Sequence, residues 1–487
     1  MLDTEDTIED SKHAELHLEV QPAQSRDDIA KDYDYAGAQA KTDPAEIRLV
    51  RKQDLRIMPV LWIMYFLNYV DRGALSQAKL NSLESDLNMQ DENFNTAVSI
   101  LVVGYVLMQI PSNMLLTRVR PSLYLASCMF LWSVISTCTG LVQSYGGLLA
   151  TRFLLGFFEA PFYPGALYLL AVFYTRKELA TRISVLFTAQ MAGLSFSNLI
   201  AAGVFEGLDG ARSLAGWRWM LFLEGSISAL TAIAAAFLLP DTRTTTWWLK
   251  PEERELAEER MMQDRLIHSH DSETVWSALR GAYRDKRTWL FCAIQNFHYA
   301  GLSFTNFLPN VLHKLGFSDT KALLLACPPY IFAGIASVSL AYSSGRFHER
   351  TWHITAAFAV AVAGFVAAAS TLNQAGRYVA CFIFPVGTYA VNSIIVAWVG
   401  TTLSQSPEKK AIVLAMTNVS AQIASIYGPY LWPDSDGPRF LIGFISSAAF
   451  SFMSLVLSWF MRILLKRENV RLKREAAQGK VVNTYAY

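Results

Sequence analysis

Long apolar runs alternate with short polar connections along most of this chain. Twelve runs reach the length of about twenty residues that an α-helix needs to cross ~30 Å of hydrocarbon. They fall at 57–77, 94–116, 122–141, 146–174, 181–205, 217–240, 288–311, 321–344, 352–371, 376–403, 411–432 and 439–465. The connection 241–287 is long, and it separates six runs from six. The pattern predicts an all-α membrane protein with twelve transmembrane helices in two six-helix bundles.

The apolar pattern and the charge distribution together divide the chain into five parts. Residues 1–46 hold thirteen Asp and Glu against four Lys and Arg, with few large apolar side chains, so we expect a disordered acidic tail. The expected parts are the N-terminal tail 1–50, the first bundle 51–240, the central cytosolic loop 241–287, the second bundle 288–465 and the C-terminal tail 466–487.

Composition supports a membrane protein. The chain is 52% hydrophobic and 13% aromatic, with a mean hydropathy of +0.25, which is too apolar for an ordinary soluble protein of 487 residues. Lys and Arg gather in the tails, in the central loop and in the connections on that same side of the membrane. We therefore expect a multi-pass protein of the plasma membrane with both termini in the cytosol.

Two charged residues interrupt the fourth apolar run. Arg152 and Glu159 are seven residues apart, which is about 700° of helical rotation, so both point to one face at positions about 10 Å apart along the axis. Charges at bilayer depth cost several kcal/mol, and chains that keep them there commonly use them for transport. A carboxyl group buried away from water suits a proton carrier, and the alternative for Glu159 is a structural carboxyl bonded to nearby backbone.

Asp71 and Arg72 form a second charged pair, about fifteen residues into the first run. One interpretation is structural, with Asp71 paired to Arg72 or to Arg152 so that two helices are held together. In the other, one arginine stays free to bind a substrate carboxylate through two parallel hydrogen bonds.

The seventh run carries a polar stripe along one helical face, made of Asn296, Tyr299, Ser303, Asn306 and Asn310. In a membrane helix such a stripe faces either a cavity or another polar helix, and we expect a cavity wall. Asn392 in the tenth run is a further candidate for the same wall. His298 lies beside the stripe, where it either titrates or simply packs.

Several motifs resemble one known family. Asn68-Tyr-Val-Asp-Arg72 resembles the first-span motif of the anion:cation symporters of the major facilitator superfamily, and Arg152-x-x-x-Gly156-x-x-Glu159 resembles their fourth span. Gly216-Trp-Arg-Trp, Glu224-Gly225 and Leu-Pro-Asp-Thr at 239–242 are similar to the fungal allantoate permease branch. The resemblance covers residues 50 to 465. It implies the major facilitator fold, a central cavity lined by spans one, four, seven and ten, and substrate binding by Arg72.

The chain also departs from the family pattern. The loop between spans two and three reads Asn113-Met-Leu-Leu-Thr-Arg118-Val-Arg120-Pro, without the family's usual aspartate and first glycine. The resemblance still implies a gating role for Arg118 and Arg120. After Arg72 this chain has Gly73-Ala74 where the branch often has Thr-Asn, so its pocket differs from that of its relatives.

These observations lead to one expected function, the proton-coupled symport of a small organic anion. Asp71 and Glu159 are the candidates for proton coupling, and the expected substrate-binding residues are Arg72, Arg152, Asn296, Tyr299, Ser303 and Asn392. The alternatives are an exporter of a fungal secondary metabolite and a nutrient sensor. We expect a monomer whose partners are substrate, protons and the lipid bilayer, with no nucleic acid. The five dispersed cysteines and the absence of a P-loop or HExxH motif predict neither a metal, a cofactor nor an enzyme.

Overall fold

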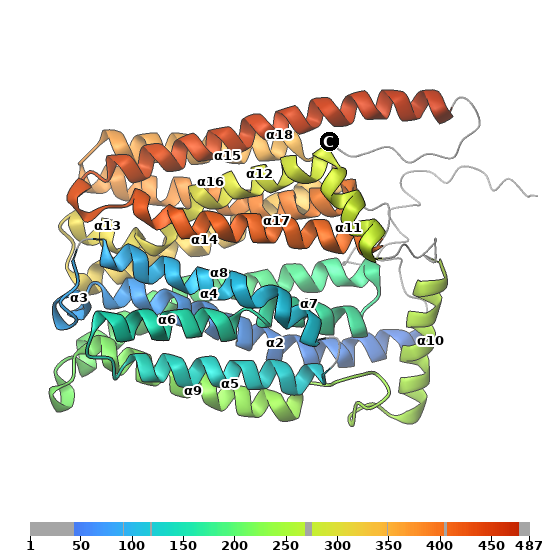
Figure 1. Ribbon diagram of the computed structural model, residues 1–487, viewed down its shortest axis with the longest axis horizontal. Coiled ribbons are helices and arrows are strands. Elements are labelled where there is room, and N and C mark those ends of the chain that lie inside the picture. Colours follow the sequence, from blue (N-terminus) through green and yellow to red (C-terminus); the bar gives the residue numbers. More distant parts are fainter. Residues whose placement is uncertain are drawn as a thin grey trace, which may run out of the picture.

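The computed structural model of the chain describes residues 43–90, 92–116, 119–267, 275–347, 349–403 and 407–476. Regular structure within these ranges is helical throughout (Figure 1). The first half contains α2 (Pro44–Ala78), α3 (Leu83–Asp86), α4 (Asn93–Leu116), α5 (Pro121–Thr139), α6 (Tyr145–Glu159), α7 (Phe162–Phe173), α8 (Arg176–Leu208), η1 (Ala211–Ser213) and α9 (Gly216–Leu238). The central segment contains α10 (Pro251–Ile267) and α11 (Val275–Arg284).

The second half repeats the arrangement of the first. It contains α12 (Lys286–Gly301), η2 (Leu302–Asn306), α13 (Leu308–Lys314), α14 (Asp319–Arg346), α15 (Thr351–Ser370), α16 (Gln374–Thr402), α17 (Pro407–Tyr427), η3 (Gly428–Leu431), η4 (Asp434–Asp436) and α18 (Leu441–Ala476). Because α6 and α7 form one interrupted span, and α12 with η2 and α13 another, each half has six membrane helices. The prediction of twelve helices in two six-helix bundles is confirmed.

The two bundles lie side by side, and a few helices join them. In the first half α2 packs on α8 and α9, while α4 packs on α6; in the second, α12 packs on α17 and α18, while α16 packs on α14 and α15. The halves meet where α8 contacts α14 and where α4 contacts α17. Figure 1 shows the first half in blue and green and the second in yellow to red, with their helices nearly parallel.

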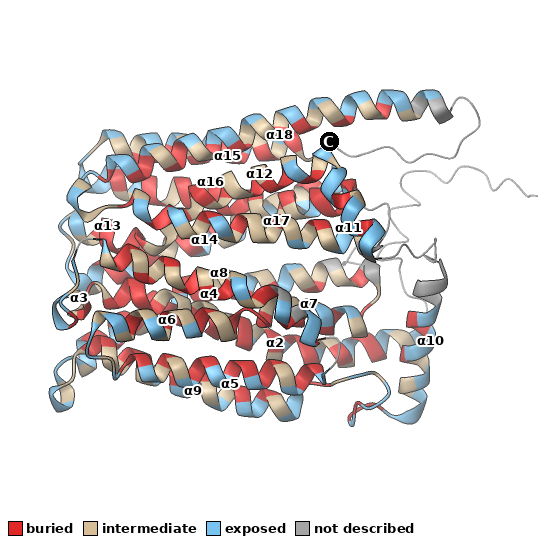
Figure 2. Cartoon of the chain, in the orientation of Figure 1, coloured by how far each residue is buried: buried red, intermediate tan, exposed pale blue. Residues whose placement is uncertain are grey.

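Length and composition identify the spans inside a bilayer. Nine helical stretches in the described part of the chain are long and apolar enough to cross a membrane. The remaining three spans are α2, α4 and α12. Large apolar side chains such as Leu230 and Phe237 are exposed on the outer faces, while the buried residues lie between the helices (Figure 2). Such an apolar exterior is stable only in lipid.

Two spans are interrupted where proline prevents a regular helix. The fourth span stops at Glu159 and resumes at Phe162, because Pro161 has no N–H for the helical ladder. The seventh span tightens into the 3₁₀ turn η2 before α13, which carries Pro309 in its first turn. Two candidate site residues lie at these breaks: Glu159 is the last residue of α6, and Ser303 lies in η2.

The two ends of the molecule differ. One end, called here the α10 end, carries α10, α11, the start of α2 and the C-terminal part of α18 (Figure 1). The opposite end carries α3, α13 and η4 and is called the Asp434 end. Helix α2 begins at Pro44 and α18 continues to Ala476, so helix extends into both segments expected to be tails. The acidic segment 1–42 lies outside the described residues.

The central segment is partly helical and is held against the first bundle. At the α10 end, Lys52 of α2 lies 2.7 Å from Glu253 of α10. Arg260 of α10 pairs with the buried Glu178 of α8 at 2.7 Å and with Glu46 of α2 at 3.1 Å. Helix α10 is therefore fixed by charge to the half of the chain that precedes it.

Candidate functional site

A large cavity lies between the two halves. Its volume is about 2260 Å³, several times that of a typical small-molecule pocket. Thr181 and Ser184 near the start of α8, with Arg346 and Arg350 around the connection between α14 and α15, line it toward the α10 end. The lining then continues between the bundles as far as Pro309 and Pro429. The cavity is therefore accessible from the α10 end.

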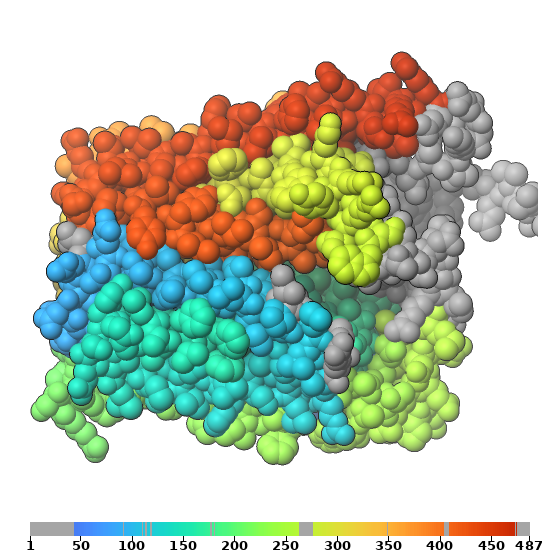
Figure 3. All heavy atoms as spheres, viewed as in Figure 1, coloured from blue at the N-terminus to red at the C-terminus, as the bar shows by residue number. Residues whose placement is uncertain are grey.

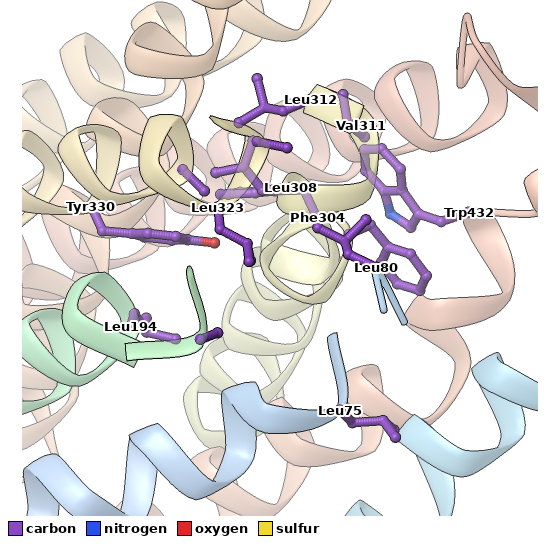
Figure 4. Close-up of a cluster of buried hydrophobic side chains, with 14 of the residues drawn as sticks. Leu75, Leu80, Leu194, Phe304, Leu308, Val311, Leu312, Leu323, Tyr330 and Trp432 are labelled. Carbon is purple, nitrogen blue, oxygen red and sulfur yellow. The ribbon is translucent and has the colours of Figure 1, made fainter. Parts of the chain in front are cut away.

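The Asp434 end of the interface is closed by apolar packing. Buried side chains of both halves form one continuous cluster there (Figure 4). The first half contributes Leu75, Leu80 and Leu194, and the second half contributes Phe304 and Trp432, among others. Water and solute cannot pass this region without separation of the bundles, because protein cores pack as densely as organic crystals.

Polar contacts between the halves reinforce this closure. Lys79 at the end of α2 is ion-paired with Asp434, which also accepts a hydrogen bond of 3.0 Å from Asn310. The hydroxyl groups of Thr96 and Tyr430 lie 3.0 Å apart. Ser99 of α4 donates to the carbonyl oxygen of Ile426 at 2.7 Å. The contacts of Lys79, Thr96 and Ser99 cross between the halves, and they would have to break for the Asp434 end to open.

The charged side chains of the cavity wall have one sign. Among the described residues that line the cavity, the charged ones are Arg72, Arg152, Arg346 and Arg350, and no Asp, Glu or Lys is present. The rest of the wall consists of hydroxyl, amide, aromatic and aliphatic side chains. An aqueous cavity walled by protein and carrying only positive charge attracts anions and repels cations.

Arg72 lines the cavity, and a buried carboxylate balances its charge. It is ion-paired with Glu159, whose side chain is 2% exposed compared with 22% for Arg72. Its guanidinium carbon lies 4.9 Å from the ring centroid of Tyr105 and 5.5 Å from that of Tyr69. The amide of Asn68, also buried, is near enough to interact with the same carboxylate. The carboxylate is thus held at the end of α6, where Pro161 interrupts the span.

Arg152 also lines the cavity but has no such partner. Its side chain is 2% exposed, its Nε has no hydrogen-bond partner, and no ion pair within 4.0 Å joins it to a described residue. Asp71, Glu159 and Glu224 are the carboxylates within electrostatic range. A buried and unpaired guanidinium is costly, which is typical of a site that receives an anionic ligand.

Asp71 points away from the cavity into the first bundle. Its carboxylate accepts hydrogen bonds of 3.2 Å from the Trp132 indole, from Ser136 of α5 and from Ser228 of α9. No ion pair joins it to a described arginine, although Arg152 is within electrostatic range. Neighbouring helix positions are about 100° apart, so Asp71 can point into the bundle while Arg72 lines the cavity.

Only part of the polar stripe of the seventh span lines the cavity. Asn296 donates to the backbone of Ser420 at 2.6 Å and accepts from Tyr427 at 2.7 Å, so it joins α12 to α17 away from the cavity lining. Tyr299 and Ser303 line the cavity, and Ser303 accepts from the Trp432 indole at 2.9 Å. Asn392 also lines the cavity, and its side-chain oxygen accepts a hydrogen bond of 2.9 Å from Gln295.

Other candidates lie outside the cavity lining. His298 is fully buried, has no hydrogen-bond partner at either ring nitrogen and packs against the Phe358 ring at 5.8 Å. Arg118 lies outside the described residues, and Arg120 is exposed as the residue before α5. Groups of three or more His, Cys, Asp or Glu side chains that could hold a metal ion do not occur in the described ranges.

Sequence reasoning missed part of the wall. Gln77 of α2 donates to Ser197 of α8 at 2.8 Å, and both line the cavity. The Tyr389 hydroxyl lies 2.7 Å from that of Thr305, again in the wall. Arg346 and Arg350 of the wall were not among the expected site residues either. Polar residues inside apolar runs were the available signal, but their facing directions depend on the tertiary packing.

Comparisons with known proteins agree with this architecture. The family model described as Major Facilitator Superfamily matches residues 61–429. The chain is 30% identical to the MFS-type transporter efuF of Hormonema carpetanum over 88% of each protein. It is 28% identical to the major facilitator-type transporter hxnP of Emericella nidulans, again over 88% of each.

Solved structures show the same fold at lower sequence identity. A bacterial homologue of the human lysosomal transporter Spinster, in an inward-facing and unoccupied conformation, superposes with a TM-score of 0.67 at 15% identity, covering 86% of this chain and 97% of that one. A D-xylose-proton symporter gives a TM-score of 0.66 at 15% identity, covering 83% and 97%. With its helices, its central cavity and these relatives, the chain belongs to the Major Facilitator Superfamily of membrane transporters.

Proposed function

We propose that this transporter carries a small organic anion together with a proton across the plasma membrane. The observation that carries the proposal is the charge of the cavity wall, where every charged side chain among the described lining residues is an arginine. An anion that leaves water needs fixed cations to replace its hydration, and arginine offers two parallel hydrogen bonds to a carboxylate. The motifs around Arg72 and Arg152 support placement in the anion:cation symporter branch, close to the allantoate permeases.

Proton coupling is proposed to run through the ion pair of Arg72 and Glu159. Protonation of Glu159 removes its negative charge and releases Arg72, whose guanidinium can then bind the substrate carboxylate. When the substrate leaves, Glu159 gives up its proton and pairs with Arg72 again. The substrate and the carboxylate thus compete for one guanidinium, which links anion movement to proton movement.

Arg152 supplies a second cation that stays available throughout this exchange. It has no paired carboxylate among the described residues, so it attracts the anion before Glu159 is protonated. Tyr299, Ser303 and Asn392 contribute hydroxyl and amide groups on the opposite wall, in the second half. A substrate held between the two halves changes the contacts of both, which is what rocking of one bundle against the other requires.

We infer that the α10 end faces the cytosol. Lys and Arg are abundant in the connections, the central segment and the tails at this end, in accordance with the positive-inside rule. In this orientation the cavity is open to the cytosol, like that of the inward-facing Spinster homologue, and the Lys79–Asp434 pair closes the outer side. Because one chain encloses the whole cavity, we propose that the monomer transports.

The test is a transport assay on the purified chain in proteoliposomes. A panel of labelled monocarboxylates, dicarboxylates, ureides, neutral sugars and amines is offered under an inwardly directed proton gradient. We expect accumulation of one or more carboxylates, its loss on addition of a protonophore, and retention of counterflow without the gradient. Transport of a neutral or cationic compound instead, or accumulation of a carboxylate that ignores the proton gradient, would contradict the proposal.

A further inference from the structure

Helix α11, in the second part of the central segment, has three distinct faces. It is ten residues long and reads Val-Trp-Ser-Ala-Leu-Arg-Gly-Ala-Tyr-Arg. Ala278 and Ala282, one helical turn apart, are fully buried. This small-residue face lets α11 pack closely on the second bundle, where it contacts α17 and α12. The side chains on its other two faces are exposed.

One exposed face is aromatic and aliphatic. Trp276 is 80% exposed, Tyr283 is 64% exposed and Leu279 is 39% exposed, and their spacing of three and four residues places them on one stripe. Trp289, at the start of α12, extends the stripe: its ring lies 5.3 Å from that of Tyr283, and its indole donates to the Tyr283 carbonyl at 2.8 Å. Exposed aromatic residues of this kind gather at membrane–water interfaces.

The third face is basic. Arg280 and Arg284 follow each other by one turn, are exposed, and lie about 70–110° around the helix from the centre of the aromatic stripe. Lys286 continues the charge at the start of α12 and is exposed as well. An amphipathic helix with aromatic residues on one side and arginines beside them fits the boundary between acyl chains and phosphate headgroups.

The position of α11 matches this boundary. Asp285 separates it from α12, and α12 enters the membrane directly afterwards. Figure 1 shows α11 crossing the ends of the neighbouring spans at the α10 end. In Figure 3 the yellow-green segment that includes α11 lies on the visible outer surface of the second half. The helix thus lies beside the bundle, at the level where its spans leave the membrane.

We propose that α11 is an interfacial helix that binds the surface of an anionic lipid bilayer. Trp276, Leu279 and Tyr283 insert among the acyl chains near the headgroups, and Arg280 and Arg284 contact lipid phosphates. Each arginine near an anionic surface adds to binding, and the attraction depends on lipid charge. The central segment is then anchored in two ways, by ion pairs of α10 to the first bundle and by lipid contact of α11 beside the second.

The test measures the depth of α11 in the full chain and needs no substrate. A nitroxide is attached at Leu279→Cys, with Ser277→Cys on another face of the same helix as the matched position, after Cys138→Ser removes the exposed native thiol. In vesicles with anionic lipid, the label at 279 should collide several-fold more often with oxygen than with a water-soluble nickel chelate. The label at 277 should show the reverse preference.

The charge dependence is tested with matched double variants. Arg280→Gln with Arg284→Gln, or vesicles of zwitterionic lipid alone, should reduce the oxygen preference at 279 several-fold. Arg467→Gln with Arg474→Gln removes the same charge from exposed positions of α18 and should leave that preference unchanged. Equal access of the nickel chelate to positions 277 and 279 would overturn the proposal. If the oxygen preference at 279 changes neither with lipid charge nor with the α11 arginine substitutions, the role given to Arg280 and Arg284 is overturned.

Discussion

Arg72 of α2 and Glu159 of α6 form an ion pair although 87 residues separate them in the chain. The pair couples the first span to the end of α6, where Pro161 interrupts the fourth span. It also distinguishes Arg72 from Arg152 in the cavity wall, because Arg72 has a carboxylate partner and Arg152 has none among the described residues. The proposed mechanism, in which the substrate anion and the Glu159 carboxylate compete for the Arg72 guanidinium, rests on this arrangement.

Glu159→Gln keeps the size and hydrogen-bonding capacity of the side chain but removes the group that takes the proton. We expect accumulation driven by a proton gradient to disappear, while exchange of substrate between the two sides continues. Proteoliposome uptake and counterflow measure the two activities separately. Glu206→Gln, at an exposed position of α8, is the matched control and should preserve both. Unchanged pH-driven accumulation in Glu159→Gln would rule out this carboxyl as the proton carrier.

Substitution of each cavity arginine by lysine separates binding from structure. Lysine keeps the charge and loses the planar fork, so loss of one charge-assisted hydrogen bond of about 1.5–3 kcal/mol should raise KM roughly tenfold to a hundredfold. For Arg152→Lys we expect that rise with a normal amount of folded protein, because no internal partner is lost. Arg72→Lys should lower both affinity and folded yield, since it also disturbs Glu159.

The family resemblance favours Arg72 as the binding residue, and the structure adds a reason to test Arg152 equally. Folded yield is measured by fluorescence-detected size exclusion and KM by initial uptake rates. Normal affinity in both lysine variants would contradict a role for either arginine in anion binding. A rise in KM confined to Arg72→Lys would leave Arg152 with a structural role only.

The hydrophobic pattern was sufficient for the spans but not for the site. The expected run 217–240 agrees with α9, Gly216–Leu238, because a predominantly apolar stretch of this length is stable in lipid as a helix that crosses the membrane. The pattern could not show that Asn296 of α12 bonds to α17, whereas Ser303 in η2 lines the cavity. That difference depends on a local break and on contacts between distant segments.

Pairing between helices is the other feature that the sequence left open. The seven-residue spacing correctly placed Arg152 and Glu159 on one buried face of α6. The partner of Glu159 is nevertheless Arg72, which comes from another helix. Asp71 was a candidate for pairing with either arginine, whereas three neutral donors surround it. Helical geometry predicts which residues share a face, and only packing decides what that face meets.

Helices α4 and α6 cross closely one turn before Glu159, and this crossing can be tested by adding one methyl group. Gly104 of α4 and Gly156 of α6 face each other's helices: a Cβ at Gly156 would lie 1.9 Å from the Leu101 carbonyl oxygen, and one at Gly104 would lie 2.2 Å from that of Phe153. Gly156→Ala must separate the two backbones, so we expect a loss of stability of about 1–3 kcal/mol or more.

Gly203→Ala is the control for this crossing, because a Cβ there meets no described atom within 4 Å and alanine favours helix. Thermal unfolding in detergent should show a lower midpoint for Gly156→Ala and an equal or higher one for Gly203→Ala. Equal midpoints for Gly156→Ala and the parent chain would show that α4 and α6 separate easily. The orientation of Glu159 on α6 would then lose this support.

The Asp434 end is expected to open when its charge contacts are weakened. Asp434→Asn removes the ion pair with Lys79, which joins the two bundles, and weakens the hydrogen bond from Asn310. A loss of about 1–2 kcal/mol on this side alone should raise the population open at the Asp434 end roughly fivefold to thirtyfold. Ala97→Cys, which is fully buried where the cavity closes, reports this opening through its labelling rate with a membrane-impermeant maleimide.

Asp319→Asn provides the matched control for this opening. Asp319 carries the same charge at the same end, but its partner His313 lies in the same bundle at 2.7 Å, so its loss should leave the labelling rate of Ala97→Cys unchanged. Lys79→Gln should accelerate labelling as Asp434→Asn does, because each variant removes one member of the same pair. If both Lys79 and Asp434 variants label at the parent rate, apolar packing around Leu75 and Trp432 holds this end closed without help from the ion pair.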